Sequence, residues 1–143
     1  MLRAVEQEGA GTLDAVVHLG DGWRDAEELY RLYPRIPLEQ VPGNCDLGRF
    51  EAPERLVFFG AFPVLLCHGH TLGVKYSLQR AAYTAQERGA KALLFGHTHT
   101  PLIDCHNGLW LINPGSIGDR RRPTYCVLTV EGERFSPANR TPD

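Results

Sequence analysis

Residues 92–99 read Ala-Leu-Leu-Phe-Gly-His-Thr-His, an apolar run that ends in a glycine and two histidines. Four consecutive apolar residues closed by a glycine are typical of a short buried strand. Two exposed histidines placed two positions apart after such a strand have little structural purpose, whereas imidazole is the commonest metal-binding side chain. The stretch therefore predicts a buried strand that ends in metal ligands.

The same arrangement recurs along the chain. Other predicted strands also end in loops that carry glycine and polar side chains: Leu13–Leu19 before Gly20-Asp21, Ile36–Val41 before Gly43-Asn44, and Phe62–Cys67 before His68-Gly69-His70. Parallel strands gather such loops at the carboxyl edge of a sheet, where open α/β proteins bind ligands. Carboxylates, imidazoles and amide oxygens all bind metals. Each motif alone is weak, but together they predict one convergent set of ligands: Asp21, Asn44, His68, His97 and His99.

Two helices are predicted between these strands. Apolar residues at helical spacing follow Asp25 and end before Pro34, which indicates a helix of about three turns. A second helix is expected over residues 77–88, because Ser77 is a suitable N-cap and Gly89 a suitable C-terminal stop. Strands alternate with helices over this part of the chain.

The last third of the chain is predicted to be rich in strands. Leu102–Cys105 and Leu109–Ile112 flank Asn107-Gly108, a pair that suits a two-residue hairpin turn. Tyr125–Val130 is expected to form the last strand before a polar tail. We therefore predict an α/β fold in which two packed mixed β-sheets are flanked by helices, within a single domain that spans residues 1–143.

The composition excludes several classes of protein. The chain has 143 residues, of which 43% are hydrophobic and 22% charged, as expected for one globular domain. Its formal net charge of -2 provides no positive field for nucleic acid or an anionic membrane. No signal peptide or membrane-spanning run is present, so we expect a cytoplasmic protein. The four cysteines form no C-x-x-C pair and are expected to be reduced.

The order and spacing of the motifs resemble those of the calcineurin-like metallophosphoesterases. The resemblance is carried by Gly20-Asp21, Gly43-Asn44-Cys45-Asp46, His68-Gly69-His70, Gly96-His97-Thr98-His99 and Asn113-Pro114-Gly115-Ser116. Within that family the chain resembles the small bacterial and archaeal phosphodiesterases, which are themselves similar to the retromer subunit Vps29. The resemblance implies two sheets packed between helices and two divalent ions at the sheet edge. Manganese is the expected metal, with nickel, iron or zinc as alternatives.

The resemblance also implies a role for each ligand. Asp21 is expected to bridge the two ions, and Asn44, His68 and His97 to complete the shell of the second ion. His99 is expected to bind the first ion. Two ions in such an arrangement lower the pKa of a shared water and stabilise an in-line displacement at phosphorus. The implied nucleophile is therefore metal-bound hydroxide, and no serine or cysteine nucleophile is needed.

Two further residues are candidates for catalysis. Many members of the family have a histidine after the asparagine, where this chain has Cys45 followed by Asp46. Asp46 is expected to orient a nearby histidine rather than to act as the acid. His70 is expected to contact the phosphate or the leaving group. Residues Arg120–Arg122 form a basic cluster, which is either a solvated loop or a site for phosphate oxygens.

The sequence departs from the family pattern at its start. The family opens with a strand that ends in Asp-x-His, and no Asp-x-His occurs in this chain. Residues 2–8 instead resemble the end of the helix that follows that strand. Either the translation start is placed too late or the segment has been lost; we favour the first explanation, because the remaining motifs are intact and a missing core strand exposes apolar surface. Since the first ion keeps only Asp21 and His99, we expect one tight site and strongly reduced activity.

Two functions compete on these grounds. The first is a metal-dependent phosphodiesterase that hydrolyses a small phosphorylated substrate. The alternative is a catalytically weak or inactive Vps29-like scaffold for protein interactions, which the absence of Asp-x-His favours. Retention of all five predicted ligands favours the enzyme. A nuclease is disfavoured because no basic stripe or aromatic platform accompanies the motifs, and homo-oligomerisation through an exposed strand edge is left open.

Overall fold

The centre of the molecule is a five-stranded mixed sheet. The structure, a computed structural model, describes residues 1–143. The sheet has the strand order β3–β4–β5–β7–β6. Its strands are β3 (Glu54–Phe59), β4 (Phe62–Cys67), β5 (Ala92–Leu94), β6 (Leu102–His106) and β7 (Leu109–Asn113). The three central strands are parallel, while β3 and β6 run antiparallel at the edges.

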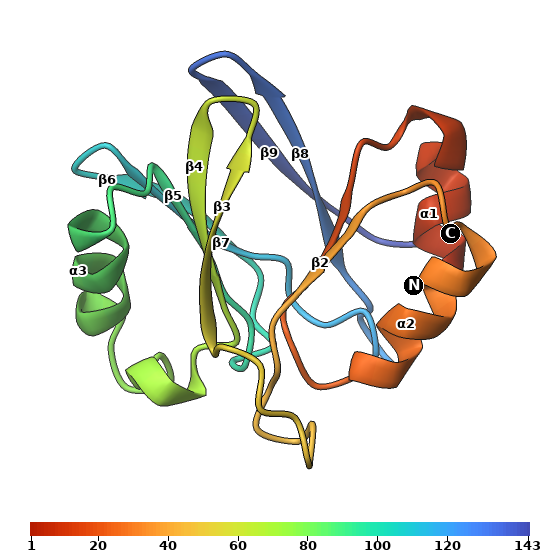
Figure 1. Cartoon of the computed structure of the whole chain (residues 1–143), viewed down its shortest axis with the longest axis horizontal. Coiled ribbons are helices and arrows are strands. Elements are labelled where there is room, and N and C mark those ends of the chain that lie inside the picture. Colours follow the sequence, from red (N-terminus) through yellow and green to blue (C-terminus); the bar gives the residue numbers. More distant parts are fainter.

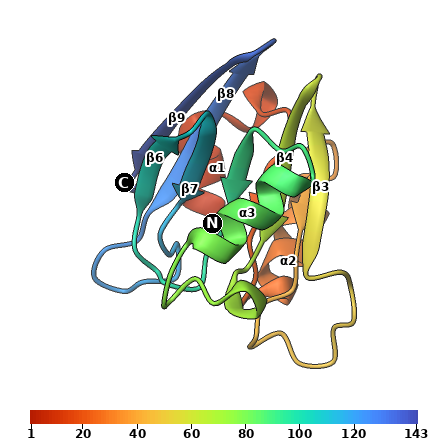
Figure 2. The same cartoon turned by 90° about the vertical axis from the view of Figure 1, so that its left-hand side faces the viewer.

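Helix α3 (Gln79–Glu87) covers one face of this sheet (Figures 1 and 2). Successive residues of a strand point to opposite faces, so β4 contributes alternately to two cores. Leu65 packs in one core with Ala81 and Ala85 of α3. Val64 and Leu66 belong to the second core, on the opposite face. The apolar run of β4 is therefore buried on both sides, as expected for a strand with parallel neighbours.

Two separate strand pairs cover the opposite face. β1 (Val16–His18) pairs in parallel with β2 (Leu38–Gln40), and β8 (Tyr125–Glu131) pairs antiparallel with β9 (Arg134–Arg140). Side chains from both pairs pack on the second core. The predicted α/β fold with two strand layers is confirmed, although the second layer consists of two hydrogen-bonded pairs rather than one continuous sheet.

Helices α1 (Leu2–Glu8) and α2 (Trp23–Leu32) form the outer layer beyond β1 and β2 (Figure 1). Val5 of α1 and Leu29 of α2 meet Ile36 in a small third core. Two short 3₁₀ helices, η1 (Ala10–Thr12) and η2 (His70–Leu72), complete the structure. No helix of the molecule combines the length and apolar character that crossing a membrane requires.

The C-terminal tail is the main correction to the predicted elements. Residues expected to form a polar tail after Tyr125–Val130 instead form β9, which Gly132 (φ 62°) joins to β8 by a tight turn. The strand was missed because most of its side chains are exposed and polar, so no apolar alternation marks it. Phe135 is its one buried side chain, and its ring stacks on Phe62 with centroids 5.0 Å apart.

The structure tests two predictions about local structure, the hairpin turn and the start of the second helix. The predicted hairpin is confirmed, because Asn107 (φ 51°) and Gly108 (φ 76°) both adopt positive φ between β6 and β7. The second predicted helix begins two residues later than expected. Leu78 is its N-cap, while the Ser77 hydroxyl accepts a hydrogen bond from the Gln79 N–H at 3.1 Å.

Candidate metal centre

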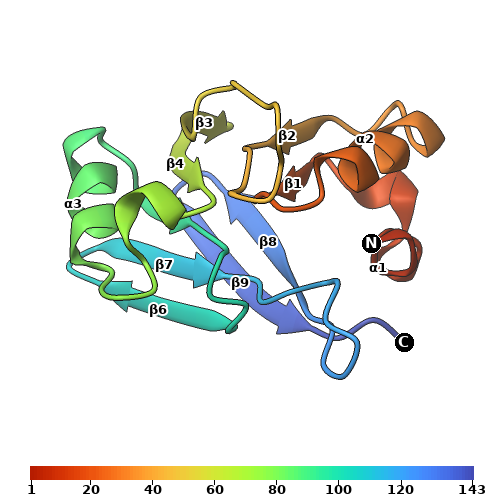
Figure 3. The same cartoon turned by 90° about the horizontal axis from the view of Figure 1, so that it is seen from below.

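The loops that follow the parallel strands meet at one edge of the molecule, which faces the viewer in Figure 3. His68 follows β4 directly, and Asp21 and His97 each lie three residues beyond the ends of β1 and β5. Asn44 lies in the loop after β2. The predicted convergence of these residues therefore follows from the shared direction of their strands.

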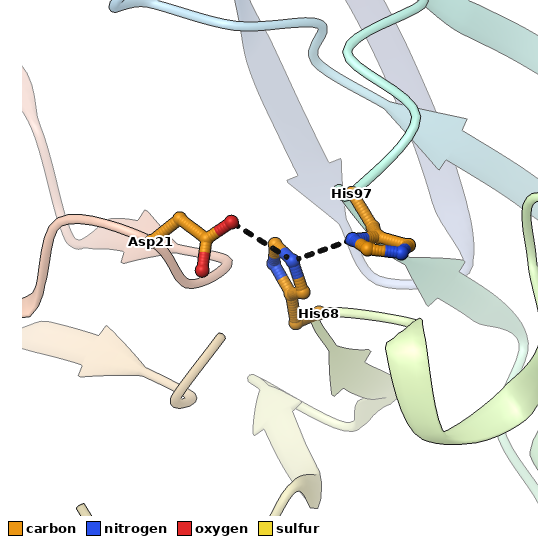
Figure 4. A group of neighbouring side chains, drawn as sticks. All are labelled: Asp21, His68 and His97. Carbon is orange, nitrogen blue, oxygen red and sulfur yellow. Dashed lines mark hydrogen bonds and ion pairs between the residues drawn. The ribbon is translucent and has the colours of Figure 1, made fainter. Parts of the chain in front are cut away.

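Four polar side chains meet at this edge. The Nε2 atom of His68 lies 2.9 Å from Asn44 Oδ1, 3.0 Å from His97 Nδ1 and 3.3 Å from Asp21 Oδ2. One ligand atom from each of Asp21, His68 and His97 lies within 4.8 Å of the other two (Figure 4). These three residues and Asn44 form what we call the donor cluster.

The hydrogen bond on the far side of the His68 ring decides what the donor cluster can bind. His68 Nδ1 lies 2.7 Å from the Leu19 carbonyl oxygen, which can only accept, so Nδ1 carries the proton. Burial lowers the pKa of His68, which favours the neutral form of the ring. In this tautomer the Nε2 atom carries a lone pair and is a hydrogen-bond acceptor. It faces the Asp21 and Asn44 oxygens, which are acceptors too. Such a set of lone pairs fits a divalent cation.

The backbone at the site adopts an unfavourable conformation. Asp21 (φ 59°), His97 (φ 64°) and His99 (φ 59°) lie in the left-handed region, which non-glycine residues rarely adopt. Backbone strain of this kind costs about 1–3 kcal/mol per residue and clusters at functional sites. Three of the predicted ligands thus carry backbone strain, and two of them, Asp21 and His97, belong to the group of residues whose ligand atoms converge.

Gly43 makes the approach of Asp21 possible. A Cβ atom at position 43 would lie 2.1 Å from Asp21 Oδ1 and 2.5 Å from the Asp21 backbone nitrogen, and movement of a side chain does not relieve the second contact. With glycine there, the Cys45 N–H donates to Asp21 Oδ1 at 2.8 Å. The other carboxylate oxygen, Oδ2, is left to face His68. One oxygen of Asp21 is therefore fixed by the backbone and the other is available to a cation.

His99 offers a direct test of this strain. Replacing His99 by glycine is expected to raise the free energy of unfolding by about 1 kcal/mol, because glycine adopts positive φ without a steric cost. His99 is exposed and its side chain makes no hydrogen bond, so little side-chain interaction is lost with the ring. Urea unfolding without metal measures the change. His106→Gly, at an exposed position in β6, is the matched control and should lower stability; a loss of stability in His99→Gly would contradict the argument.

Of the remaining predicted residues, His70 lies beside the histidines of the donor cluster. His99 is not among the residues whose ligand atoms converge. The ring of His70 lies 5.3 Å from that of His68 and 6.1 Å from that of His97, between centroids. Its Nδ1 atom is buried and has no hydrogen-bond partner. Arg120–Arg122 are exposed, and the Asp119 carboxylate accepts the N–H groups of the second and third of these arginines at 2.8 Å each.

Asp46 holds two loops together from behind the donor cluster. Its carboxylate accepts four backbone N–H groups at 2.8–3.0 Å, donated by Asp21, Gly22, Trp23 and Gly43. Partial burial acts to raise the pKa of Asp46, but the four hydrogen bonds outweigh it and lower that pKa to about 2. The carboxylate also lies at the N-terminus of α2, where negative charge is stabilised. It bonds no histidine side chain in this structure.

Asn113 holds the loop that carries His97. Its amide nitrogen donates to the Gly96 carbonyl at 3.1 Å and to the Thr98 hydroxyl at 3.0 Å, and its Oδ1 accepts the Gly115 N–H at 2.9 Å. The Asn-Pro-Gly-Ser motif therefore fixes the histidine loop.

The Leu19 carbonyl, which orients His68, was not predicted from the sequence, because any residue type supplies a carbonyl at that position.

Comparison with known proteins identifies the family of the chain. Residues 1–133 match the family model described as the calcineurin-like phosphoesterase superfamily domain. A probable metallophosphoesterase of Bacillus subtilis, YsnB, is 34% identical over 136 residues, which cover 92% of this chain and 78% of YsnB. A crystal structure from Streptococcus pneumoniae, described as a predicted phosphoesterase, is 27% identical with a TM-score of 0.80, over 98% of this chain and 80% of the other.

More distant structures share the fold. Vps29 of Cryptosporidium parvum superposes with a TM-score of 0.72 at 16% identity, over 98% of this chain and 87% of Vps29. A structure described as a novel archaeal phosphodiesterase gives a TM-score of 0.67 at 16% identity, over 96% and 90% of the two chains. The resemblance inferred from the motifs is thereby confirmed at the level of the family. The chain belongs to the calcineurin-like phosphoesterase superfamily.

Proposed function

We propose that this chain is a metal-dependent phosphodiesterase that hydrolyses a small organic phosphate. The observation that carries the proposal is the convergence of His68 Nε2 with the oxygens of Asp21 and Asn44, at 3.3 and 2.9 Å, while His68 Nδ1 faces the Leu19 carbonyl. These residues, with His97, would hold one divalent cation, for which we propose manganese. When bound, such a cation supplies the Lewis acid that activates water and stabilises charge on the phosphate oxygens.

Backbone and side-chain groups around the donor cluster hold its ligand atoms in place. The Leu19 carbonyl keeps the proton of His68 on Nδ1, and the Cys45 N–H fixes Asp21 through Oδ1. Asp46 ties the loop after β1 to the loop after β2, so we propose that it positions Asp21 rather than exchanging a proton with substrate. The fixed backbone means that the donors need little rearrangement when they bind.

His70 is the proposed contact for the phosphate or the leaving group. Its ring stands beside the rings of both cluster histidines but is not part of the donor cluster. A histidine in this position is able to donate a hydrogen bond to a phosphate oxygen. For His99, we propose that it contributes to a second ion when further ligands are present.

A substrate with two ester groups is favoured over a monoester by the resemblance to the small prokaryotic phosphodiesterases and by the shared fold of the archaeal phosphodiesterase. The donor cluster suits one ion, and one ion provides only half of a two-metal clamp. We therefore propose that residues 1–143 alone are active but slower, by orders of magnitude, than a form that binds two ions.

Hydrolysis of bis(p-nitrophenyl) phosphate with added MnCl₂ tests the proposal. The 143-residue chain is expected to release p-nitrophenol only when metal is present, and EDTA is expected to abolish the release. A chain to which a strand that ends in Asp-x-His has been added at the N-terminus is expected to be at least about 100-fold faster, because the two added ligands would allow a second ion to complete the clamp. Equal rates for the two chains would contradict the one-ion account.

The alternative is a Vps29-like scaffold for protein interactions, which is favoured by the absence of Asp-x-His from the chain. A scaffold gains nothing from a strained, preorganised set of lone pairs, whereas a metal centre needs one. Metal-dependent hydrolysis by neither chain in the experiment above would overturn the enzymatic proposal and leave the scaffold.

A further inference from the structure

The side chain of His18 lies beside the loop that carries Asp21. His18 is the last residue of β1, and its carbonyl accepts the Val41 N–H at 3.2 Å, which ties its backbone to the end of β2. Alternate residues of a strand point to the same face, so the His18 ring lies on the face of Val16, which packs in the third core. The ring is therefore on the side of β1 that α2 covers.

One edge of the His18 ring touches both residues that flank Asp21. Its Nδ1 atom accepts a hydrogen bond from the Gly20 N–H at 3.3 Å, and that N–H has no other acceptor in the structure. Because an N–H can only donate, Nδ1 is unprotonated. On the other side of Asp21, a Cβ atom at Gly22 would lie 3.2 Å from His18 Nε2 and 3.4 Å from Cε1. The Nδ1–Cε1–Nε2 edge thus faces the turn of residues 20–22, which we call the Asp21 turn.

The Asp21 turn has an unusual backbone that needs support. Its three residues all adopt positive φ, at 98°, 59° and 140°, and this region is unfavourable for the aspartate. The Asp46 carboxylate holds the turn from one side, through the N–H groups of Asp21 and Gly22. Neither of these hydrogen bonds involves Gly20, whose N–H is held by His18 alone. His18 therefore supplies the support that Asp46 does not.

The position of Gly20 matters because it lies in close contact with the donor cluster. A Cβ atom at position 20 would lie 2.7 Å from the Gly43 backbone and 2.7 Å from His68 Nδ1. The preceding residue, Leu19, places its carbonyl oxygen 2.7 Å from His68 Nδ1. The following residue, Asp21, places Oδ2 at 3.3 Å from His68 Nε2 (Figure 4). A shift of Gly20 would therefore change both of these contacts with the His68 ring.

We propose that His18 is a positioning residue, whose ring holds the Asp21 turn so that the carboxylate of Asp21 faces His68. This inference deepens the proposed function and rests on it for the part that His18 plays in metal binding. Histidine suits the position because Nδ1 supplies an acceptor to Gly20 while the far side of the ring packs against Gly22. Loss of a group that orients metal ligands lowers metal affinity about 10- to 100-fold.

Two substitutions of His18 test the proposal. His18→Leu keeps apolar bulk and removes the acceptor, whereas His18→Asn keeps an acceptor oxygen in the place of Nδ1. In calorimetric titrations with MnCl₂, the Kd is expected to rise about tenfold in His18→Leu and to change less than about threefold in His18→Asn. Val16→Ala, on the same face of β1 and in the third core, is the matched control. It should lower stability in urea and leave the Kd within about twofold.

Amide hydrogen exchange of the metal-free chain separates this inference from the proposed function. The Gly20 N–H reports on the hydrogen bond to His18, and the Cys45 N–H, which donates to Asp21 Oδ1 at 2.8 Å, reports on the position of Asp21. Both amides are expected to exchange at least about tenfold faster in His18→Leu, and neither in His18→Asn or Val16→Ala. If the wild type binds no Mn²⁺ but these differences are present, the metal-dependent proposal fails while the positioning role stands.

Other outcomes overturn the inference. An unchanged Kd and unchanged exchange of the Cys45 amide in His18→Leu would show that the ring does not position Asp21. Equal effects in His18→Leu and His18→Asn would exclude the hydrogen bond to Gly20 as the cause. Equal effects in Val16→Ala would assign the change to the stability of β1 as a whole rather than to His18.

Discussion

Replacing Asp21 by asparagine is expected to lower the affinity for Mn²⁺ at least about 100-fold and metal-dependent hydrolysis about a thousandfold. Asn keeps the size of the side chain, tolerates the positive φ at this position and still offers Oδ1 to the Cys45 N–H. The change therefore removes one negative charge from the donor cluster and leaves the loop folded. Calorimetric titration with MnCl₂ and p-nitrophenol release measure the two effects.

Asp14→Asn is the matched control for this variant. Asp14 is an exposed carboxylate before β1 that forms no hydrogen bond or ion pair through its side chain. The same loss of charge at that position should leave both measurements within about twofold of the wild type, because a distant exposed charge is screened. Similar losses in the two variants would mean that overall charge, rather than coordination by Asp21, governs metal binding.

Replacing Asp46 by alanine is expected to lower the free energy of unfolding by about 3 kcal/mol at pH 7. Four backbone N–H groups lose their acceptor and the first turn of α2 loses its negative charge. Because the four hydrogen bonds lower the pKa of Asp46 from 3.8 to about 2, the carboxylate stabilises the fold above about pH 4. This stabilisation is lost as the pH falls from 4 to 2.

Urea unfolding at several pH values checks this expectation. The stability difference between wild type and Asp46→Ala should be largest at neutral pH and should shrink as the pH falls through the range in which Asp46 is protonated. Asp104→Ala, at an exposed position in β6, serves as the control and should show no comparable change. A difference that is small at pH 7, or that does not depend on pH, would contradict the structural role given to Asp46.

The strand and loop pattern was sufficient to predict where the site forms. Phe95 and Gly96 end an apolar run before His97, and Cys67 ends another before His68, so the directions of β4 and β5 already place both histidines at one edge. The two strands are parallel neighbours in the sheet, which makes the convergence a consequence of register. Long apolar runs closed by glycine are the clearest signal in this sequence.

Other features depend on tertiary contacts that no local pattern encodes. β9 has a polar exposed face, and only Phe135 marks its inner side. The proton on His68 Nδ1 is set by the carbonyl of Leu19, which is 49 residues away. Asp46 was expected to orient a histidine, but its geometry shows hydrogen bonds to backbone groups brought near it by folding. Sequence spacing predicts which side chains are candidate ligands, and it does not reveal which groups hold them in place.

The central claim is that the donor cluster binds one divalent cation, and anomalous diffraction from crystals soaked in MnCl₂ tests it most directly. The account predicts one strong manganese peak in contact with Asp21 Oδ2, Asn44 Oδ1, His68 Nε2 and His97 Nδ1. In crystals of the Asp21→Asn variant, that peak should be absent or much weaker. A wild-type crystal with no peak among these four atoms, or with manganese bound only elsewhere on the chain, would contradict the account.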